Sequence, residues 1–306
     1  MSNPQPTNFS LSGRPVLLAT DGSPASAGAT HVAQALAIEL RARVHTLVVL
    51  DTRGAPIPPP LDAAIQLSSE VVGPGVHAEQ AEAVRRGLAA TLGHEVDWPV
   101  RMGVGTPAAA IVREVSRIDA AMIVMGLRRH GRADRVVNDE TTLNVIRTAS
   151  CPVLGVTPEL RHLPKRILAA IDFSSASLSS AAVARALLPR DGRLVLAYVP
   201  PLAMYPPDDG EGVIHALGVQ AGFDRATREL GTDGLTVDSV VLHHEMKRQV
   251  AELLIEYADT TSADVIAAGS ARLSRVDRWM LGSVSTDLVR DGRHSVLVVP
   301  PAGKRS

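Results

Sequence analysis

Cysteine and aromatic residues are scarce in this chain of 306 residues. The single cysteine, Cys151, has no partner for an intrachain disulfide, which is typical of proteins from reducing compartments. Aromatic side chains make up 3% of the sequence, too few to predict base-stacking platforms for nucleic acid. The formal net charge is −1, so no overall field attracts nucleic acid or an anionic membrane.

Long apolar runs are also absent. No window approaches the ~18 uncharged apolar residues that a membrane-spanning helix needs. Residues 1–13 are polar and lack the apolar stretch of a signal peptide. These absences predict a cytoplasmic protein that has neither membranes nor nucleic acid among its partners.

The sequence does contain a repeated unit. In 16–37 and again in 167–188, an apolar run ends at an acidic residue and is followed by a Ser-rich turn and an Ala-rich helix. Two later pairs of blocks match in the same order, 124–131 with 267–274 and 151–156 with 294–299. Three matched pairs in one order indicate a domain that was duplicated and fused.

The duplication predicts two domains, each long enough to bury its own core. The segment TPELRHLPK at 157–165 contains the connection between them. We expect a tail, a first domain, a linker and a second domain at 1–13, 14–157, 158–164 and 165–301.

Ten short apolar runs predict strands. They are 16–20, 44–50, 96–102, 121–125 and 153–156, then 167–171, 194–199, 237–242, 265–268 and 296–299. Helical stretches lie between them, at 25–41, 77–92, 107–118 and 141–149, then 176–188, 217–230, 247–259 and 284–291. Continuous rather than alternating runs are typical of strands buried on both faces of a parallel sheet. The alternation predicts an α/β fold with one open sheet in each half and helices on both faces.

Two proline-rich segments, 51–62 and 200–212, follow the second predicted strand of each half. Proline is excluded from helix interiors and central strands, so these segments are loops. They are either lids at the edge of the sheet where α/β proteins bind ligands or tolerated surface insertions.

A glycine pattern in the second half has the features of a phosphate site. Gly269 ends the fourth strand, and Gly282-Ser283 precedes a helix. We expect Ser283 to cap this helix, whose free N–H groups would attract phosphate. Asp172, at the end of the first strand, would bond to an adenine amino group or a ribose. An ordinary strand-to-helix turn explains the same residues, so the spacing alone does not decide.

Together these motifs resemble the universal stress protein family, in a tandem two-domain form. The resemblance covers nearly the whole chain and is strongest at VLLATDGSPAS, at VGTPAAAIVREV, at AAMIVMG and at MLGSVSTDLVRDGRHSVLVVP. It implies two Rossmann-like domains of the adenine nucleotide alpha hydrolase type, each with five parallel strands in the order 3-2-1-4-5. Many members bind ATP, with phosphates on the glycine loop and adenine near the first two strands, whereas others lack the glycines and do not.

For the second half, the resemblance implies a set of nucleotide-binding positions. They are Ala170, Asp172, Val199, Gly269, Arg272, Gly282, Ser283, Val284 and Ser285. Arg272 stands at the family's middle glycine, where its guanidinium would either grip a phosphate or fill the space. The expected cofactor is ATP in this half only, and whether Mg²⁺ accompanies it stays open.

The first half keeps the spacing of this loop but not its chemistry. Gly126, Arg129 and Asp139-Glu140 lie 143 residues before their counterparts. Two like charges ~4 Å apart repel by roughly 4 kcal/mol at an effective dielectric constant near 20. The helix dipole returns only ~0.3–1 kcal/mol. We therefore expect no ATP in this half, and an ion pair between Arg129 and the two acids.

Other chemical signals are weak. His243-His244-Glu245 offers too few converging ligands for a structural zinc site, and Cys151 is expected to be a buried thiol. No P-loop lysine or nucleophile elbow is present, so we expect no catalytic residue and no fast ATP hydrolysis, while slow hydrolysis stays compatible.

Two other functions remain open from the sequence. Arg272 and the missing GxP turn at 243–248 are compatible with a nucleotide-free structural or interaction protein. An enzyme of a related adenine-binding class would need an SGGxDS-type or HxGH-type signature, and neither is found. The last strands, within 152–156 and 295–299, are expected to pair with each other inside the chain, and a homodimer stays open.

Overall fold

The computed structural model describes residues 9, 11, 13–51, 74–127, 138–201, 210–243, 248–270 and 282–301. The chain divides into two compact units, the first being Leu11–His162 and the second beginning at Leu163. The two units are described separately below. Most of each proline-rich segment predicted as a loop lies outside the described residues.

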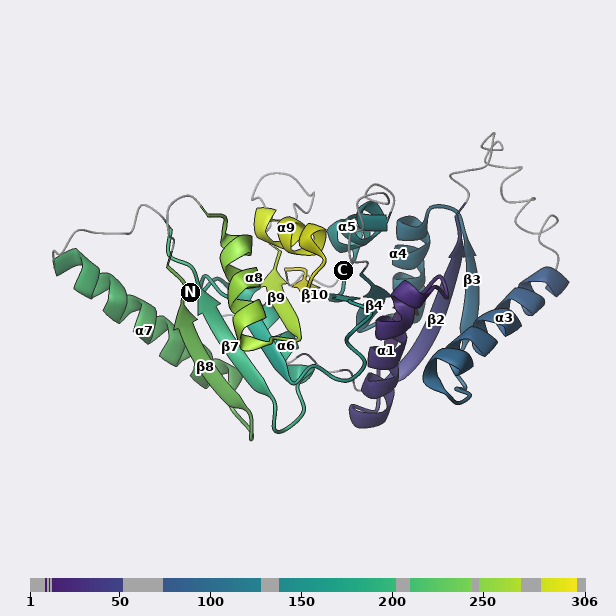
Figure 1. Ribbon diagram of the computed structural model, residues 1–306, viewed down its shortest axis with the longest axis horizontal. Coiled ribbons are helices and arrows are strands. Elements are labelled where there is room, and N and C mark those ends of the chain that lie inside the picture. The colour runs from purple at the N-terminus through teal and green to yellow at the C-terminus, as the bar shows by residue number, and fades with distance from the viewer. Residues whose placement is uncertain are drawn as a thin grey trace. The chain divides into compact units, whose positions relative to one another are not determined.

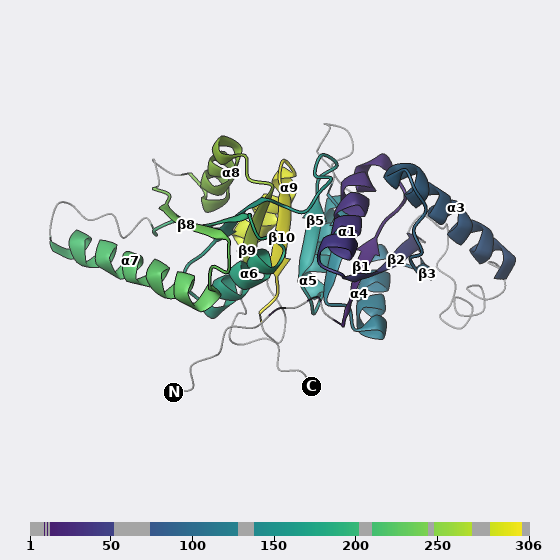
Figure 2. The ribbon, with the colours of Figure 1, turned by 90° about the horizontal axis from the view of Figure 1, so that it is seen from below.

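The first unit is a five-stranded parallel sheet in the order β3-β2-β1-β4-β5. Its strands are β1 (Pro15–Ala19), β2 (Arg43–Leu50), β3 (Val100–Val104), β4 (Met122–Gly126) and β5 (Val153–Val156). Its helices are the 3₁₀ helix η1 (Pro24–Ser26), α1 (Ala27–Glu39), α3 (Pro74–Leu92), α4 (Pro107–Ile118) and α5 (Asn138–Thr148). Helices α1 and α3 cover one face, and α4 and α5 cover the other (Figure 1, Figure 2).

The second unit repeats this arrangement, with parallel strands in the order β8-β7-β6-β9-β10. These strands are β6 (Arg166–Ala170), β7 (Arg193–Tyr198), β8 (Thr236–Val241), β9 (Val265–Gly269) and β10 (Ser295–Val299). The helices are α6 (Ser175–Ala186), α7 (Gly210–Leu230), α8 (Val250–Thr261) and α9 (Ser283–Asp291). Both units therefore confirm the predicted order 3-2-1-4-5 and the α/β class.

The core of each unit is built around its central strands. All of β1 is buried, and β4 and β9 are buried up to their final glycines. Leu17 and Ile266 have no accessible surface. Burial of such a side chain stabilises the fold by about 1.5–3 kcal/mol. The continuous apolar runs of the sequence thus correspond to strands covered on both faces.

The predicted burial is wrong for β3 and β8, which are only partly buried. Each stands at the outer end of the strand order of its unit. The predicted strand at 96–102 is also shifted, because pairing begins where the amide of Thr46 donates to the carbonyl of Pro99 (2.8 Å). Asp97 and Pro99 favour an irregular approach to the sheet, since both residue types are depleted in strands.

The duplication is visible in the helix ends. Asp119 is the C-cap of α4 and Ser262 is the C-cap of α8, and both adopt the left-handed conformation, with φ of 49° and 52°. They are 143 residues apart, the spacing of the predicted repeat. Two non-glycine residues in the same sparsely populated conformation indicate a shared ancestral loop.

Strands β5 and β10 each stand last in the order of their own unit. Their expected pairing concerns the placement of one unit relative to the other and stays a prediction. Among the helices of the described residues, none combines the length and hydropathy of a membrane span.

Candidate functional site

The turn after β6 holds the carboxylate of Asp172 in a fixed orientation. Asp172 Oδ1 accepts from the Ser174 amide (3.0 Å) and from the Ser177 hydroxyl (2.7 Å). Ser174 is the N-cap of α6, and its hydroxyl accepts from the Ser177 amide (3.3 Å). Both of the hydrogen bonds to the Asp172 carboxylate are made to the same oxygen, Oδ1.

These hydrogen bonds keep Asp172 ionised. Partial burial by itself would raise the pKa of the carboxyl, but the bonds from Ser174 and Ser177 outweigh it and hold the pKa below its usual value. The turn in the first unit shares two hydrogen bonds with this turn: the Ser23 amide donates to Asp21 (2.9 Å), and the Ser26 hydroxyl donates to the Ser23 carbonyl (2.8 Å). It differs in that the hydroxyl of Ser26, the counterpart of Ser177, also accepts from Thr20 (2.8 Å).

An aromatic cluster beside this turn was not predicted. Phe173 has a φ of 62°, and its ring centroid lies 5.2 Å from that of Tyr198 and 5.4 Å from that of Phe223. Gly222 makes room for it, because a Cβ there would lie 2.8 Å from the ring. The available signal was the repeat itself, which places Phe173 where the first unit has Gly22 (φ of 71°).

Gly269 has a packing role. A Cβ at this position would lie 2.6 Å from the carbonyl oxygen of Ala176, at the start of α6. In the first unit, a Cβ at Gly126 would lie 3.0 Å from the carbonyl oxygen of Ala25. In both units this glycine therefore lets the end of the fourth strand approach the first helix. The ligand approach predicted from the sequence is not needed to explain it.

Gly282 is different, because the described structure does not require a glycine there. It has φ −59° and ψ 154°, which any residue adopts, and no described atom lies within 4 Å of the position of a Cβ. The predicted cap is corrected here: Gly282 is the N-cap of α9, and Ser283 is the first helical residue. Gly282 has no side chain to satisfy the amides of the first turn, which includes Val284 and the buried Ser285.

The structure brings most of the predicted positions to one edge of the second unit. Ala170 and Gly269 end β6 and β9, and Val199 follows β7; all three are half-buried. Since β6 lies between β7 and β9, this is the point where the strand order reverses, and open α/β sheets bind ligands there. Arg272 lies outside the described residues, so its role stays a prediction.

In the first unit, Asp139 and Glu140 lie within the first turn of α5, which begins at Asn138. This helix starts two residues earlier in the repeat than α9, whose counterpart position would be 140. Glu140 is exposed, and acidic residues in a first turn interact favourably with the helix dipole. The side chain of Asp139 and all of Arg129 lie outside the described part of the chain, so their ion pair stays a prediction.

The remaining candidates from the sequence have little chemical potential. Cys151 is buried as expected, and burial raises the pKa of its thiol to about 12. In the described ranges, no group of three or more His, Cys, Asp or Glu side chains is arranged to hold a metal ion. His244 and Glu245 fall outside those ranges.

The fold and these groups define a duplicated, doubly wound α/β protein with polar groups at the switch point of its second unit. Residues 13–157 and 164–300 each match the model of the Universal stress protein family. The chain therefore belongs to the universal stress protein family.

Relatives agree with this assignment. A universal stress protein of Mycobacterium tuberculosis strain H37Rv is 28% identical over 254 residues, which cover 78% of this chain and 83% of that protein. The crystal structure of a universal stress protein from Archaeoglobus fulgidus matches with a TM-score of 0.64 at 18% identity, covering 94% of this chain and 98% of that one. A functionally unknown protein from Pseudomonas aeruginosa PAO1 matches with a TM-score of 0.55 at 16% identity, covering 95% and 94%. At these identities the solved structures support the fold alone.

Proposed function

We propose that this chain is a cytoplasmic stress-response binding module that holds an adenine nucleotide, ATP being the leading candidate, in its second unit without fast turnover. Asp172 would accept a hydrogen bond from the base or ribose. Ala170 and Val199 would provide partly buried surface beside it. The uncapped amides at the start of α9 would receive the phosphate charge.

Gly282 is the observation that carries this proposal. Its backbone conformation and open surroundings are compatible with other residues, and Asp, Ser or Asn would cap α9 better. Glycine is itself an accepted N-cap, only a few tenths of a kcal/mol weaker than these residues. A ligand that approaches the helix start closely is the additional reason that we propose for it. Gly269 offers no such support, since packing explains it.

The experiment places a negative charge at the start of α9. Gly282→Asp puts a carboxylate where phosphate would lie, and repulsion of up to roughly 4 kcal/mol should weaken ATP binding by well over tenfold. Asp is a favoured N-cap, so the stability of the variant should stay within a few tenths of a kcal/mol of the parent or rise. Isothermal titration with ATP and urea unfolding measure the two effects separately.

Gly218→Asp is the matched control. Gly218 lies in α7 of the same unit, and it too has no described atom within 4 Å of a Cβ position. This variant adds the same charge away from the site, so ATP affinity should not change beyond about twofold. Equal ATP affinities for Gly282→Asp and the parent protein would refute the assignment.

A second candidate function is a nucleotide-free interaction protein. The packing role of Gly269 favours it, because that glycine would be kept even without a ligand. Mass spectrometry of the denatured, freshly purified protein for adenine nucleotides decides between the two. Absence of nucleotide, together with no thermal shift in millimolar ATP, would favour the second candidate. Pairing of β5 with β10 and self-association of whole chains are proposals that either function allows.

A further inference from the structure

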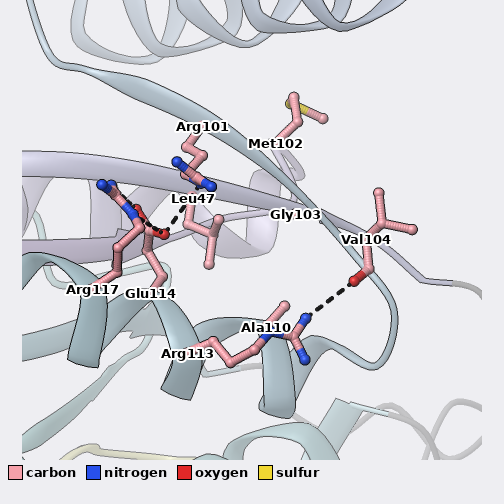
Figure 3. Close-up of a pocket in the computed structure, with 9 residues that line it drawn as sticks. All are labelled: Leu47, Arg101, Met102, Gly103, Val104, Ala110, Arg113, Glu114 and Arg117. Carbon is pink, nitrogen blue, oxygen red and sulfur yellow. Dashed lines mark hydrogen bonds and ion pairs between the residues drawn. The ribbon is translucent and has the colours of Figure 1, made fainter. Parts of the chain in front are cut away.

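A pocket of about 530 Å³ lies in the first unit, beside the edge strand β3 of its sheet. It is formed by β2, β3 and α4, and contains none of the residues proposed to bind nucleotide. Figure 3 shows Leu47 beside Arg101 and Arg117, and Arg113 apart from that pair, next to Ala110. The volume is within the range of about 300–1,000 Å³ that is typical of small-molecule sites.

Two of the arginines share one carboxylate. Glu114 of α4 is only 6% exposed and accepts from Arg117 at both oxygens (2.6 and 2.9 Å). Arg101 of β3 lies 3.3 Å from the same carboxylate. Burial alone would raise the pKa of Glu114, but the bonds and charge of Arg117 and the charge of Arg101 keep it low. This end of the pocket therefore has two cations for one anion.

The other end of the pocket has an arginine without a carboxylate partner among the described residues. Arg113 is exposed and donates to the carbonyl of Val104 at 3.3 Å, which leaves most of its five donors unused (Figure 3). With three arginines and one glutamate, the pocket lining has an excess of two positive charges. An anion is the complement of such a lining.

The floor between the arginines is apolar and hollow. Leu47 and Ala110 are buried, and a Cβ at Gly103 would lie 3.4 Å from a carbon of each. A side chain at Gly103 would therefore press against this floor. A purely inorganic ion would not use this floor, whereas an anion with an apolar body would.

The second unit shows that the fold does not need these residues. With the repeat spacing of 143, Arg113, Glu114 and Arg117 correspond to Glu256, Tyr257 and Thr260. In the strand register, Val240 takes the place of Arg101. Glu256 is itself paired, with Arg248. The same architecture forms without any of the three arginines. In the first unit, Arg101 and Arg117 compensate the buried charge of Glu114, whereas Arg113 has no carboxylate partner among the described residues.

We propose that this pocket binds a small organic oxyanion, that is, a carboxylate or phosphate group on an apolar body. Arg113 takes the anionic group, and Leu47, Gly103 and Ala110 contact the body. The planar guanidinium matches either oxyanion with two parallel hydrogen bonds. The inference is independent of the nucleotide site, which lies in the other unit.

Amide chemical shifts of the full-length, isotope-labelled protein test the proposal, with phenyl phosphate and phenylacetate as the two probes. Saturable shifts confined to β3, α4 and the middle of β2 are expected for at least one probe, and the preferred probe identifies the oxyanion. Inorganic phosphate, which lacks the body, and benzyl alcohol, which lacks the charge, should both bind more weakly. No saturable shift in this region with either probe at millimolar concentration overturns the proposal.

Two variants make the test specific. Arg113→Gln should lower the affinity for the probe by about tenfold or more, which is the usual effect of losing a hydrogen bond to a charged group. The matched control, Arg86→Gln, removes an exposed arginine from α3 on the opposite face, and affinity should stay within about twofold. Equal effects of the two variants would contradict a site at Arg113.

Gly103→Val fills the floor while leaving every charge in place, and should also abolish the shifts. Thermal unfolding of each variant establishes that the fold is retained. Gly282→Asp should leave probe binding unchanged, so failure here and failure of the nucleotide proposal are distinguishable. Probe binding that survives Gly103→Val in a folded protein would contradict the proposed position of the apolar body.

Discussion

At the scale of single residues, the orientation of Asp172 depends on neighbours that are near in sequence. An acid at a strand end followed by serines two and five positions later occurs in both units, and in the second unit both serines donate to the acid. The role of Gly269 could not be predicted in this way. Its reason is a carbonyl from α6, which comes close only after the sheet has formed.

Asp172→Asn tests the importance of this turn for stability. The folded pKa of Asp172 lies below its ordinary value, so the unfolded chain binds the proton more readily. The resulting stability is present above the unfolded pKa and is lost as the pH falls through the folded pKa. We expect Asp172→Asn to lose about 1 kcal/mol at pH 7, allowing for solvent screening, and less at acid pH.

Urea unfolding at pH 7 and near pH 3 measures this difference. Ser177→Ala removes one donor and should raise the pKa of Asp172. The double variant should lose less stability than the two single losses combined, because the two residues share one interaction. Fully additive losses would show that the hydroxyl does not stabilise the carboxylate.

His45 of β2 reports on the charges around the arginine pocket. Burial lowers its pKa below the ordinary value of 6.5, the charges of Arg117 and Arg43 lower it further, and Glu114 opposes them. We therefore expect the pKa of His45 to rise in Arg117→Gln and to fall further in Glu114→Gln. Imidazole chemical shifts followed against pH measure both. Shifts of the same sign in the two variants would contradict this electrostatic account.

At the scale of secondary structure elements, the start of α6 lies very close to the end of β9 at Gly269. Gly269→Ala would place a methyl carbon 2.6 Å from a backbone carbonyl oxygen, and a backbone cannot move aside cheaply. Overpacking of this kind costs about 1–3 kcal/mol. We expect that loss of stability in urea unfolding.

Two other glycines give the matching series. Gly126→Ala, at 3.0 Å from its nearest backbone oxygen, should lose less stability. Gly282→Ala, with no described atom near the new Cβ, should lose only what alanine costs at an N-cap, about 0.5–1 kcal/mol. If all three variants were equally stable, the packing role of the strand-end glycines would be wrong.

Most elements of this fold can be predicted from the sequence, because continuous apolar runs and helical stretches alternate without interruption. The exceptions have physical reasons. Strand β3 begins late because Asp97 and Pro99 precede it, and β8 is an edge strand that is only partly buried. The arginine pocket was not predicted, since its residues come from β2, β3 and α4 and converge only in the folded unit.

At the scale of the whole molecule, two units of one topology differ in the chemistry that they present. The second has Asp172 and an open helix start at Gly282, whereas the first has acidic residues in the corresponding helix turn and an arginine pocket elsewhere. Duplication explains this difference, because one copy can retain a site while the other changes. The units are therefore expected to bind different ligands.

One ATP per chain is the expected stoichiometry. Isothermal titration should give a single class of site, and Gly282→Asp should remove it without revealing a second. Two equivalent sites per chain would show that Asp139 and Glu140 do not exclude the triphosphate from the first unit. A site that persists in Gly282→Asp would place the nucleotide away from α9.

The fit of Gly126 and Gly269 against the first helix of each unit bears on how related sequences are interpreted. A residue that the packing of the fold requires is kept in the sequence even after the domain has stopped binding its ligand. Its presence in a homologue is therefore no sign that nucleotide is bound, and a loop that has kept only this glycine can belong to a repeat that has lost its original ligand. The more informative position is Gly282, where the described structure would accept another residue.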